Sequence, residues 1–224
     1  MRYGVAMLAA AVLGASAGGC KLVPNTTGTE ARARTSGSQA SASAEPASPL
    51  EAMAQEMWKP KVLPYFQEKA TDLSVLAPAI KAGIDGAGKQ YGFRPGGEGT
   101  PWSFAASFKG KIIAANTETR AATASIDIDG DGKPDATLQL GPVIRGTALR
   151  DTLPFVSFSS FADQIAFASF SRTLNDRAYK SVLEALPRQG LPGREVSGRG
   201  AFTLRGASDD ILITPVALEL GRAP

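Results

Sequence analysis

The sequence predicts an α+β fold that is mainly β, with helices over residues 48–92 and an OB-like five-stranded barrel over 100–220. Three stretches of alternating apolar and polar residues precede one helical stretch, and two more alternating stretches follow it. This β-β-β-α-β-β order is typical of an OB-type barrel. The chain shows no internal repeat, which disfavours propellers and solenoids. An open α+β sheet with the same elements is the alternative.

The helical part begins at a complete helix-start signature. Residues 48–51 read Ser-Pro-Leu-Glu, which supplies an N-cap serine, a proline at the first helical position and a capping-box glutamate. Pro60 and Pro64 then predict a break or a kink. A further helix is expected over about 72–84, before a glycine-rich stretch closes this part.

Alternation locates the five strands of the second part. We expect strands over 102–116, 123–128, 136–140, 195–205 and 211–220. Gly110 interrupts the first strand and is interpreted as a bulge, and Pro215 predicts an edge or a bulge in the last. The glycines at 198 and 200 are expected to help the sheet coil. The intervening helix carries apolar residues at every fourth position from Leu174 to Leu186.

The N-terminus predicts export and lipid attachment. Residues 1–19 have the basic start, short apolar run and small residues of a secretory signal peptide, and the run is too short to span a bilayer. Cys20 lies where a bacterial lipobox places the cysteine that receives diacylglycerol and an N-acyl chain such as palmitate. Residues 20–47 are predicted to be a lipidated start and flexible tether with an r.m.s. span of roughly 30 Å. Residues 48–224 are expected to form one periplasmic domain, and Lys21 favours the outer over the inner membrane.

Composition excludes several classes of function. The chain has no histidine, which removes histidine-based catalytic triads and histidine-ligated zinc. Its single cysteine cannot form an internal disulfide or a thiolate metal cluster. A formal net charge of +3 gives no strong field for nucleic acid. We therefore expect a protein that is not an enzyme and does not bind nucleic acid.

A cluster of carboxylates follows the second strand. Asp127, Asp129, Asp131 and Asp135 occupy positions 1, 3, 5 and 9 of a loop with glycine at position 6, like the front of a Ca²⁺ loop. Position 12 is Leu138, where such a loop has a bidentate glutamate. Asp-Gly-Asp-Gly between two strands is also what a hairpin turn requires. A plain turn and a calcium-stabilised turn are both open interpretations.

A second group of candidates lies between the third strand and the helix. Arg145 and Arg150 are spaced so that they can fork onto a carboxylate, a phosphate or sugar hydroxyls. The alternative is structural, with Arg150 pairing with Asp151 or Asp163 to hold the loop closed. We take Arg145, Arg150, Asp151 and Trp102 as the candidate ligand or partner contacts.

Five phenylalanines follow this group. We expect them to belong to the core, and the alternative is a groove for a partner. They are Phe155, Phe158, Phe161, Phe167 and Phe170.

Several segments share one family pattern. They are Cys20–Asn25, Tyr91–Arg94, Gly97–Gly99 with Trp102–Phe104, the Asp-Gly-Asp-Gly turn, Leu140–Asp151 with Leu153–Phe155, and Phe158–Ile165. In these segments the chain resembles the bacterial family of predicted periplasmic lipoproteins (domain of unknown function 2291), except that the family tends to have asparagine where this chain has Asp163. The resemblance implies an exported lipoprotein whose genes often lie near carbohydrate ABC transporters, and it supplies no catalytic residues.

These observations lead to one expected function and two alternatives. We expect a lipid-anchored accessory or binding module of carbohydrate ABC uptake, on the periplasmic side of the envelope. Its partners would be the membrane, ABC-transporter components or a small carbohydrate. The alternatives are a structural envelope interaction lipoprotein with a Ca²⁺-stabilised turn, and an envelope hydrolase.

Overall fold

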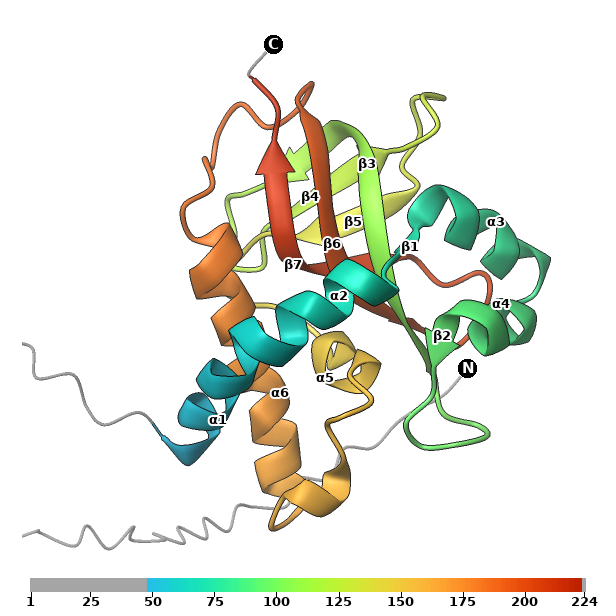
Figure 1. Cartoon of the computed structure of the whole chain (residues 1–224). Helices are drawn as coiled ribbons and strands as arrows, with labels where there is room; N and C mark the ends of the chain where they lie inside the picture. The colour runs from blue at the N-terminus through green and yellow to red at the C-terminus, as the bar shows by residue number, and fades with distance from the viewer. Residues whose placement is uncertain (1–47, 223–224) are drawn as a thin grey trace, which may run out of the picture. The chain divides into compact units, whose positions relative to one another are not determined.

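Five strands pair in a closed circuit in the computed structural model, which describes residues 48–222 (Figure 1). The strands are β3 (Trp102–Asn116), β4 (Thr123–Asp127), β5 (Ala136–Gln139), β6 (Glu195–Leu204) and β7 (Leu212–Leu220). β3 pairs antiparallel with β4 and β6, β4 with β5, and β6 with β7, while a short parallel pairing of β5 with β7 closes the circuit. The predicted order is confirmed, because α6 (Gln164–Ala178) lies between β5 and β6 in the chain.

The first helices follow the predicted start. α1 (Pro49–Met57) begins with a complete capping box, in which the Ser48 hydroxyl accepts from the Glu51 amide and the Glu51 carboxylate accepts from the Ser48 amide. The expected break at the prolines is a π-helical turn, η1 (Trp58–Val62), which leads directly into α2 (Leu63–Lys69). The chain therefore bends without leaving the helical conformation.

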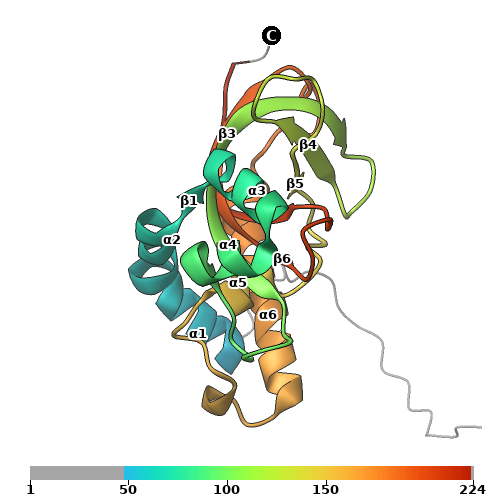
Figure 2. The same cartoon turned by 90° about the vertical axis from the view of Figure 1, so that its right-hand side faces the viewer.

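Two short strands and two helices connect α2 to the barrel. β1 (Thr71–Asp72) and β2 (Gly92–Phe93) both pair with β3. α3 (Leu73–Ala82) starts at its Asp72 cap, and α4 (Ile84–Tyr91) follows beside β3 (Figure 2). The sequence did not predict α4, because Gly86 and Gly88 lower its helix propensity. Gly88 is required by packing, since a Cβ there would overlap the indole ring of Trp102.

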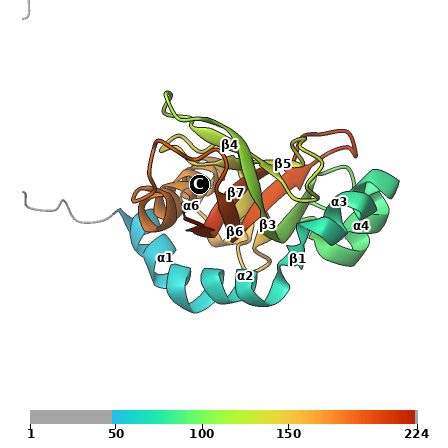
Figure 3. The same ribbon diagram turned by 90° about the horizontal axis from the view of Figure 1, so that it is seen from above.

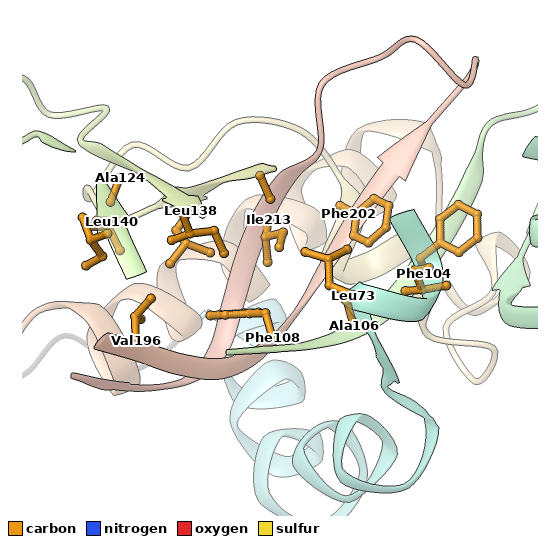
Figure 4. Packing of buried hydrophobic residues seen from close by; sticks show 14 of the residues in the cluster. Leu73, Phe104, Ala106, Phe108, Ala124, Leu138, Leu140, Val196, Phe202 and Ile213 are labelled. Atoms are coloured by element: carbon orange, nitrogen blue, oxygen red, sulfur yellow. The ribbon is translucent and has the colours of Figure 1, made fainter. Parts of the chain in front are cut away.

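The barrel interior holds one apolar cluster. The alternation of β3 turns Phe104, Ala106 and Phe108 inward, where Phe104 stacks on its register partner Phe202 with ring centroids 5.1 Å apart (Figure 4). Leu73, at the start of α3, packs against the same cluster and is fully buried. Burial of such side chains stabilises the fold by about 1.5–3 kcal/mol each.

A second apolar cluster covers the outside of the barrel. The alternate residues of the same strands, such as Ala105 and Ala201, face outward and pack against Trp58 and Phe66 of the first helical segment and Phe170 of α6. Viewed from above, α1 and α2 run along this side of the barrel (Figure 3). β3 and β6 are therefore buried on both faces over part of their length.

The predicted bulge at Gly110 is wrong. β3 runs unbroken through this residue, and the irregularity in its pairing with β4 falls between Ile112 and Ala114. Gly110 has a different role, because a Cβ there would collide with the backbone carbonyl of Asp127 on β4. The glycine allows the two backbones to approach closely.

The irregularity predicted in the last strand is confirmed as a bulge. Gly200 pairs with Pro215 whereas Arg199 pairs with Ala217, so β7 carries one extra residue. A Cβ at Gly200 would lie 2.5 Å from the carbonyl oxygen of Thr214. Glycine on one strand and a bulge on the other bend the pair, as a small barrel requires.

The prediction that the five phenylalanines belong to the core is partly wrong. Phe170 is fully buried, and Phe161 and Phe167 are half-buried. Phe155 and Phe158 are instead 38% and 50% exposed. The predicted helix also starts earlier than expected, at Gln164, because only its second half shows the regular apolar spacing.

The N-terminal predictions fall outside the part of the chain that the structure describes. The signal peptide over 1–19, the lipidation site at Cys20 and the tether over 20–47 remain predictions. Within residues 48–222, no helix is both long enough and apolar enough to cross a bilayer.

The two glycines of α4 give a matched prediction for folding stability. We expect Gly88→Ala to destabilise the protein by roughly 1–3 kcal/mol, because the new methyl must displace the Trp102 ring. Gly86 has open space around its Cα, so Gly86→Ala should stabilise by about 0.5–1 kcal/mol through helix propensity. Urea unfolding of both variants measures the difference, and equal effects would contradict the packing argument.

Candidate functional site

A cleft of about 430 Å³ opens beside the outer face of β3 and β6. The loop between β2 and β3, the two strands, and the segment from α5 (Ala148–Thr152) to α6 form its walls. Its lining combines aromatic rings, an ion pair and hydroxyl groups: Phe93, Phe158, Phe167, Arg150, Asp151, Thr100, Ser103, Ser157 and Thr203, with Pro95, Gly96, Pro101, Pro154 and Val156.

Two hydroxyl groups meet at the strand wall of the cleft. Ser103 and Thr203 are register partners on β3 and β6, and their hydroxyl oxygens lie 3.1 Å apart. They occupy the same outer face as Ala105 and Ala201, which the helices cover. The outer face of the strand pair therefore changes from apolar to polar where the helical cover ends.

An ion pair on α5 forms another wall. The Nε and Nη2 atoms of Arg150 lie 2.8 and 2.7 Å from Oδ1 of Asp151, and the side chains are only 12% and 17% exposed. Arg150 also donates through Nη1 to the carbonyl of Phe167 at 3.2 Å, and its guanidinium carbon lies 3.8 Å from the centre of that ring. The hydroxyl of Thr147 donates to the other oxygen of Asp151. The pair is thus oriented from several sides and carries no net charge.

The loop before α5 is fixed to the barrel by side-chain amides. Gln139 of β5 accepts a hydrogen bond from the Arg145 amide and donates to the Arg145 carbonyl and to the Thr214 hydroxyl. Asn175 of α6 donates to the carbonyl of Gly146, whose φ of 85° suits glycine. These contacts position α5 and its ion pair relative to the strands.

Arg145 and Trp102 do not line this cleft. The side chain of Arg145 is exposed, and its backbone makes the bonds to Gln139. Trp102 points to the opposite face of β3 from Ser103, where its indole N–H donates to Asp85 at 2.9 Å and Arg94 stacks on its ring. The hydrogen bonds from Trp102 and Arg94 lower the pKa of Asp85 below its usual range. Ligand contacts by Arg145 and Trp102 stay predictions.

The structure distinguishes between the two candidate partners of Arg150. Asp151 is its partner, whereas the Asp163 carboxylate accepts the Ala166 amide at 2.7 Å and caps α6. This arrangement matches the structural interpretation of Arg150, and it places the same residue at the edge of a cleft.

Sequence reasoning missed the hydroxyl pair and the aromatic walls. Ser103 and Thr203 are 100 residues apart, and nothing local in either strand indicates that they face each other. Phe93 follows the predicted helices, and Phe158 and Phe167 were assigned to the core. The pairing register of β3 with β6 brings the two hydroxyls together, and the packing of β2 and of the segment from α5 to α6 beside these strands adds the aromatic rings.

The aspartate-rich turn joins β4 to β5. The two carboxylate oxygens of Asp127 accept the amides of Gly130 at 2.6 Å and Gly132 at 2.9 Å. Asp135 accepts the amide of Ile128 at 2.7 Å. These hydrogen bonds satisfy the backbone of the turn and account for its shape without a cation.

Three of the four predicted calcium ligands come together. Asp127, Asp129 and Asp135 each offer a carboxylate oxygen within 4.8 Å of the others. Asp131 instead bonds to the Lys133 amide and lies 3.1 Å from its ammonium group, and these contacts lower the pKa of Asp131. Oxygen donors of this kind suit a hard cation such as Ca²⁺.

A larger hollow of about 940 Å³ lies next to this turn. It is open to solvent, and its lining includes exposed Lys109, Lys111 and Glu195. We take the smaller cleft as the candidate site, because Arg150 and Asp151 are half-buried, Ser103 is buried, and each of the three has a defined hydrogen-bond partner.

Comparison with known proteins identifies the family. The model of the family described as "Predicted periplasmic lipoprotein (DUF2291)" matches residues 9–219. The chain belongs to this family. The match places the lipoprotein on the periplasmic side of the cell envelope.

The solved structures support the fold of the lipoprotein. A crystal structure of an OB-fold protein from Thermotoga maritima is similar, with a TM-score of 0.62 over 78% of this chain and 99% of that chain. The two sequences are 18% identical, so the likeness shows the fold alone. The OB-like α+β fold expected from the sequence is confirmed. No curated protein matches the chain.

A double-mutant cycle tests the assignment of the ion pair. We expect Arg150→Met and Asp151→Asn to show a coupling energy of about 1–3 kcal/mol in urea unfolding, because their charges are in direct contact. Arg150→Met with Asp163→Asn should be additive within about 0.5 kcal/mol. Asparagine remains a good N-cap, so this control keeps α6 intact. A larger coupling to Asp163 would contradict the structure.

Proposed function

We propose that this lipoprotein is a non-enzymatic binding module that holds a small neutral polyhydroxyl ligand, of carbohydrate type, in the cleft beside β3 and β6. The observation that carries the proposal is the meeting of the Ser103–Thr203 hydroxyl pair with the Arg150–Asp151 ion pair in one cleft.

The charge of the cleft favours a neutral ligand. Arg150 and Asp151 are the two charged residues in its lining, among the residues that the structure describes, and they neutralise each other. An anion would meet the carboxylate, and a cation would meet the guanidinium. Arg150 has five N–H donors and uses only part of them on Asp151 and Phe167, so it retains donors for ligand hydroxyls.

The aromatic walls suit the apolar faces of a sugar ring. Phe93, Phe158 and Phe167 contribute to the lining, while Ser103 and Thr203 offer groups that both donate and accept. A concave site with apolar walls and a few fixed polar groups is the usual form of a small-molecule site. The cleft has both the apolar walls and the fixed polar groups of such a site.

The same cleft offers little for catalysis. Glycoside hydrolysis ordinarily needs two carboxyl groups, and Asp151 is the one acidic residue among the described residues of the lining. Its oxygens already accept from Arg150 and Thr147. These features support a binding role over the hydrolase alternative.

The cellular role that we propose is service to a carbohydrate ABC uptake system, as an auxiliary ligand binder or a partner of its components. The family resemblance supports this role through the genes that often lie beside those of the family. We further propose that Cys20 carries the diacylglycerol and N-acyl chain and that the outer membrane holds the anchor, since Lys21 replaces the aspartate of the usual inner-membrane retention signal.

Sugar binding to the full chain in detergent tests the proposal. We expect saturation-transfer NMR with glucose, galactose, xylose and ribose to show contact of at least one sugar with the protein. Ser103→Ala combined with Thr203→Val should weaken that contact about tenfold, because two hydrogen-bonding groups are lost. Loss of both partners together leaves no orphaned hydroxyl, so the melting temperature should change little.

The control is Ser107→Ala, on β3 and outside the cleft. It should leave sugar binding unchanged. Equal sugar binding by the double variant and the wild type would show that the sugar binds outside this cleft. Chemical conversion of a sugar by the protein would support the hydrolase alternative instead.

We also propose, as a second candidate, a structural interaction lipoprotein with a calcium-stabilised turn. The specific observation in its favour is the approach of three carboxylates, from Asp127, Asp129 and Asp135, to within 4.8 Å. Like charges at this distance repel, and a bound cation would relieve the repulsion.

Calorimetry of the full chain with Ca²⁺ tests this second candidate. It predicts heat of binding and a higher melting temperature at millimolar calcium, since a ligand that binds only the folded state stabilises it. Asp129→Asn should remove both effects, whereas Asp131→Asn should retain them, because Asp131 faces Lys133. If the wild type shows neither heat of binding nor a shift in melting temperature, the loop is a hairpin turn that does not bind calcium.

A further inference from the structure

An exposed apolar surface lies at the end of the domain between α5 and α6. In residues 154–165 all side chains except those of Val156 and Phe161 are exposed. Phe155 is 38%, Phe158 50% and Ile165 77% exposed. Three large apolar side chains of one short segment are therefore exposed, and exposed apolar area of this kind is a candidate contact with another molecule or a membrane.

The exposed rings of this surface pack against other aromatic side chains of the domain. The ring of Phe158 packs edge-on against Phe167 with centroids 5.6 Å apart, and Phe161 connects Phe167 to the fully buried Phe170. Phe155 packs against Tyr65 of α2 in the same manner, at 6.0 Å. The exposed rings are therefore anchored to the second apolar cluster and stay presented to solvent.

The same segment is almost without charge. Residues 154–165 contain no lysine or arginine, and Asp163 is their one acidic residue. The Asp163 carboxylate accepts the Ala166 amide, and the hydroxyls of Ser157 and Ser159 lie 3.0 Å from each other. The free-energy cost of removing this surface from water is low for a segment of its length, because few ionic groups lose their hydration.

The start of the described chain lies at the same end of the domain. Figures 1 and 2 both show α1 beside α6 and away from the β4–β5 end of the barrel, and Glu51 in the first turn of α1 lines a hollow together with Thr173 and Asp176 of α6. Ser48 precedes α1, and 28 residues separate Cys20 from Ser48 if Cys20 is included. A flexible chain of that length spans roughly 30 Å, so it would keep the start of α1 within about that distance of the bilayer that holds the anchor.

We propose that this surface, formed by Phe155, Phe158 and Ile165, contacts the lipid bilayer to which the lipoprotein is anchored. Its rings and the isoleucine side chain enter the interfacial region, and the anchor supplies the proximity. A tether of this length gives a high effective concentration, so a contact too weak to hold a free protein is still populated. The proposal rests on membership of the lipoprotein family and is independent of the ligand proposed for the cleft.

The absence of basic residues from 154–165 specifies the kind of lipid contact. Binding that depends on buried apolar area alone does not require anionic headgroups and resists salt. Phe158 also lines the cleft, so the contact would place the cleft beside the bilayer.

The thiol chemistry of the chain allows a direct test. Cys20 is the single cysteine of the sequence, and acylation blocks it, so an introduced cysteine can be labelled alone. We would label Ser159→Cys, in the exposed segment, and Glu219→Cys, an exposed residue near the end of β7, with a polarity-sensitive fluorophore. The full-length acylated proteins are incorporated into vesicles of phosphatidylcholine and phosphatidylethanolamine and recovered by flotation.

The label at position 159 should shift to shorter emission wavelength and be quenched by nitroxide-labelled lipid, whereas the label at 219 should not. The difference should persist in 0.5 M salt, at about which the Debye length falls to a few ångströms. Phe158→Ser combined with Ile165→Ser should abolish the difference between the labels at 159 and 219. Val75→Ser removes a valine that is 47% exposed on α3 and should leave it unchanged.

Equal lipid quenching at 159 and 219, or none at either, would overturn the proposal. Protection of position 159 only after envelope proteins are added would assign the surface to a protein partner instead. A chain that does not float with the vesicles lacks the anchor, and the proposal falls with it. Sugar binding to the cleft is measured in a separate experiment, so failure of the lipid-contact proposal does not contradict the proposed sugar site, and the reverse also holds.

Discussion

The long antiparallel pairing of β3 with β6 is the interaction on which the other parts of the structure depend. It runs without interruption from Trp102 opposite Leu204 to Lys111 opposite Glu195. Each strand presents alternate side chains to opposite faces, so this one register determines both what enters the barrel and what meets the helices. A slip by one residue would exchange the two sets and expose both clusters.

Both the cores and the candidate site follow from this alternation. Phe104 and Phe202 meet inside the barrel, and Ala105 and Ala201 lie under the helices on its outside. The small alanines let the helices approach closely. Beyond the edge of the helical cover, the same outer face carries the Ser103–Thr203 pair. Ser103 is only 1% exposed, and its hydroxyl is tolerated there because it lies within hydrogen-bond distance of the Thr203 hydroxyl.

Local sequence patterns predicted the parts of the fold that are determined by neighbouring residues. The capping box at Ser48 and the bulge at Pro215 are present because each depends on contacts within a few residues or on the missing amide of proline. Features that depend on distant neighbours were missed. Gly110 was interpreted as a bulge, but it makes room for the β4 backbone, and the glycines of α4 concealed a helix that needs Gly88 beneath Trp102. Phe158 was assigned to the core because aromatic residues are usually buried, but it is 50% exposed, and none of the elements within residues 48–222 covers it fully.

The sequence alone determined the family of lipoproteins, the order of the elements and the absence of histidine chemistry. These follow from motifs spread along the chain, from periodicity and from composition. Tertiary structure decided that Arg150 pairs with Asp151 and that Asp163 caps α6, that Trp102 and Arg145 lie outside the cleft, and that two hydroxyls 100 residues apart form one of its walls. Periodicity records which face of a strand or helix a residue occupies. It does not record which other segment that face will meet, and that is set by packing of the whole domain.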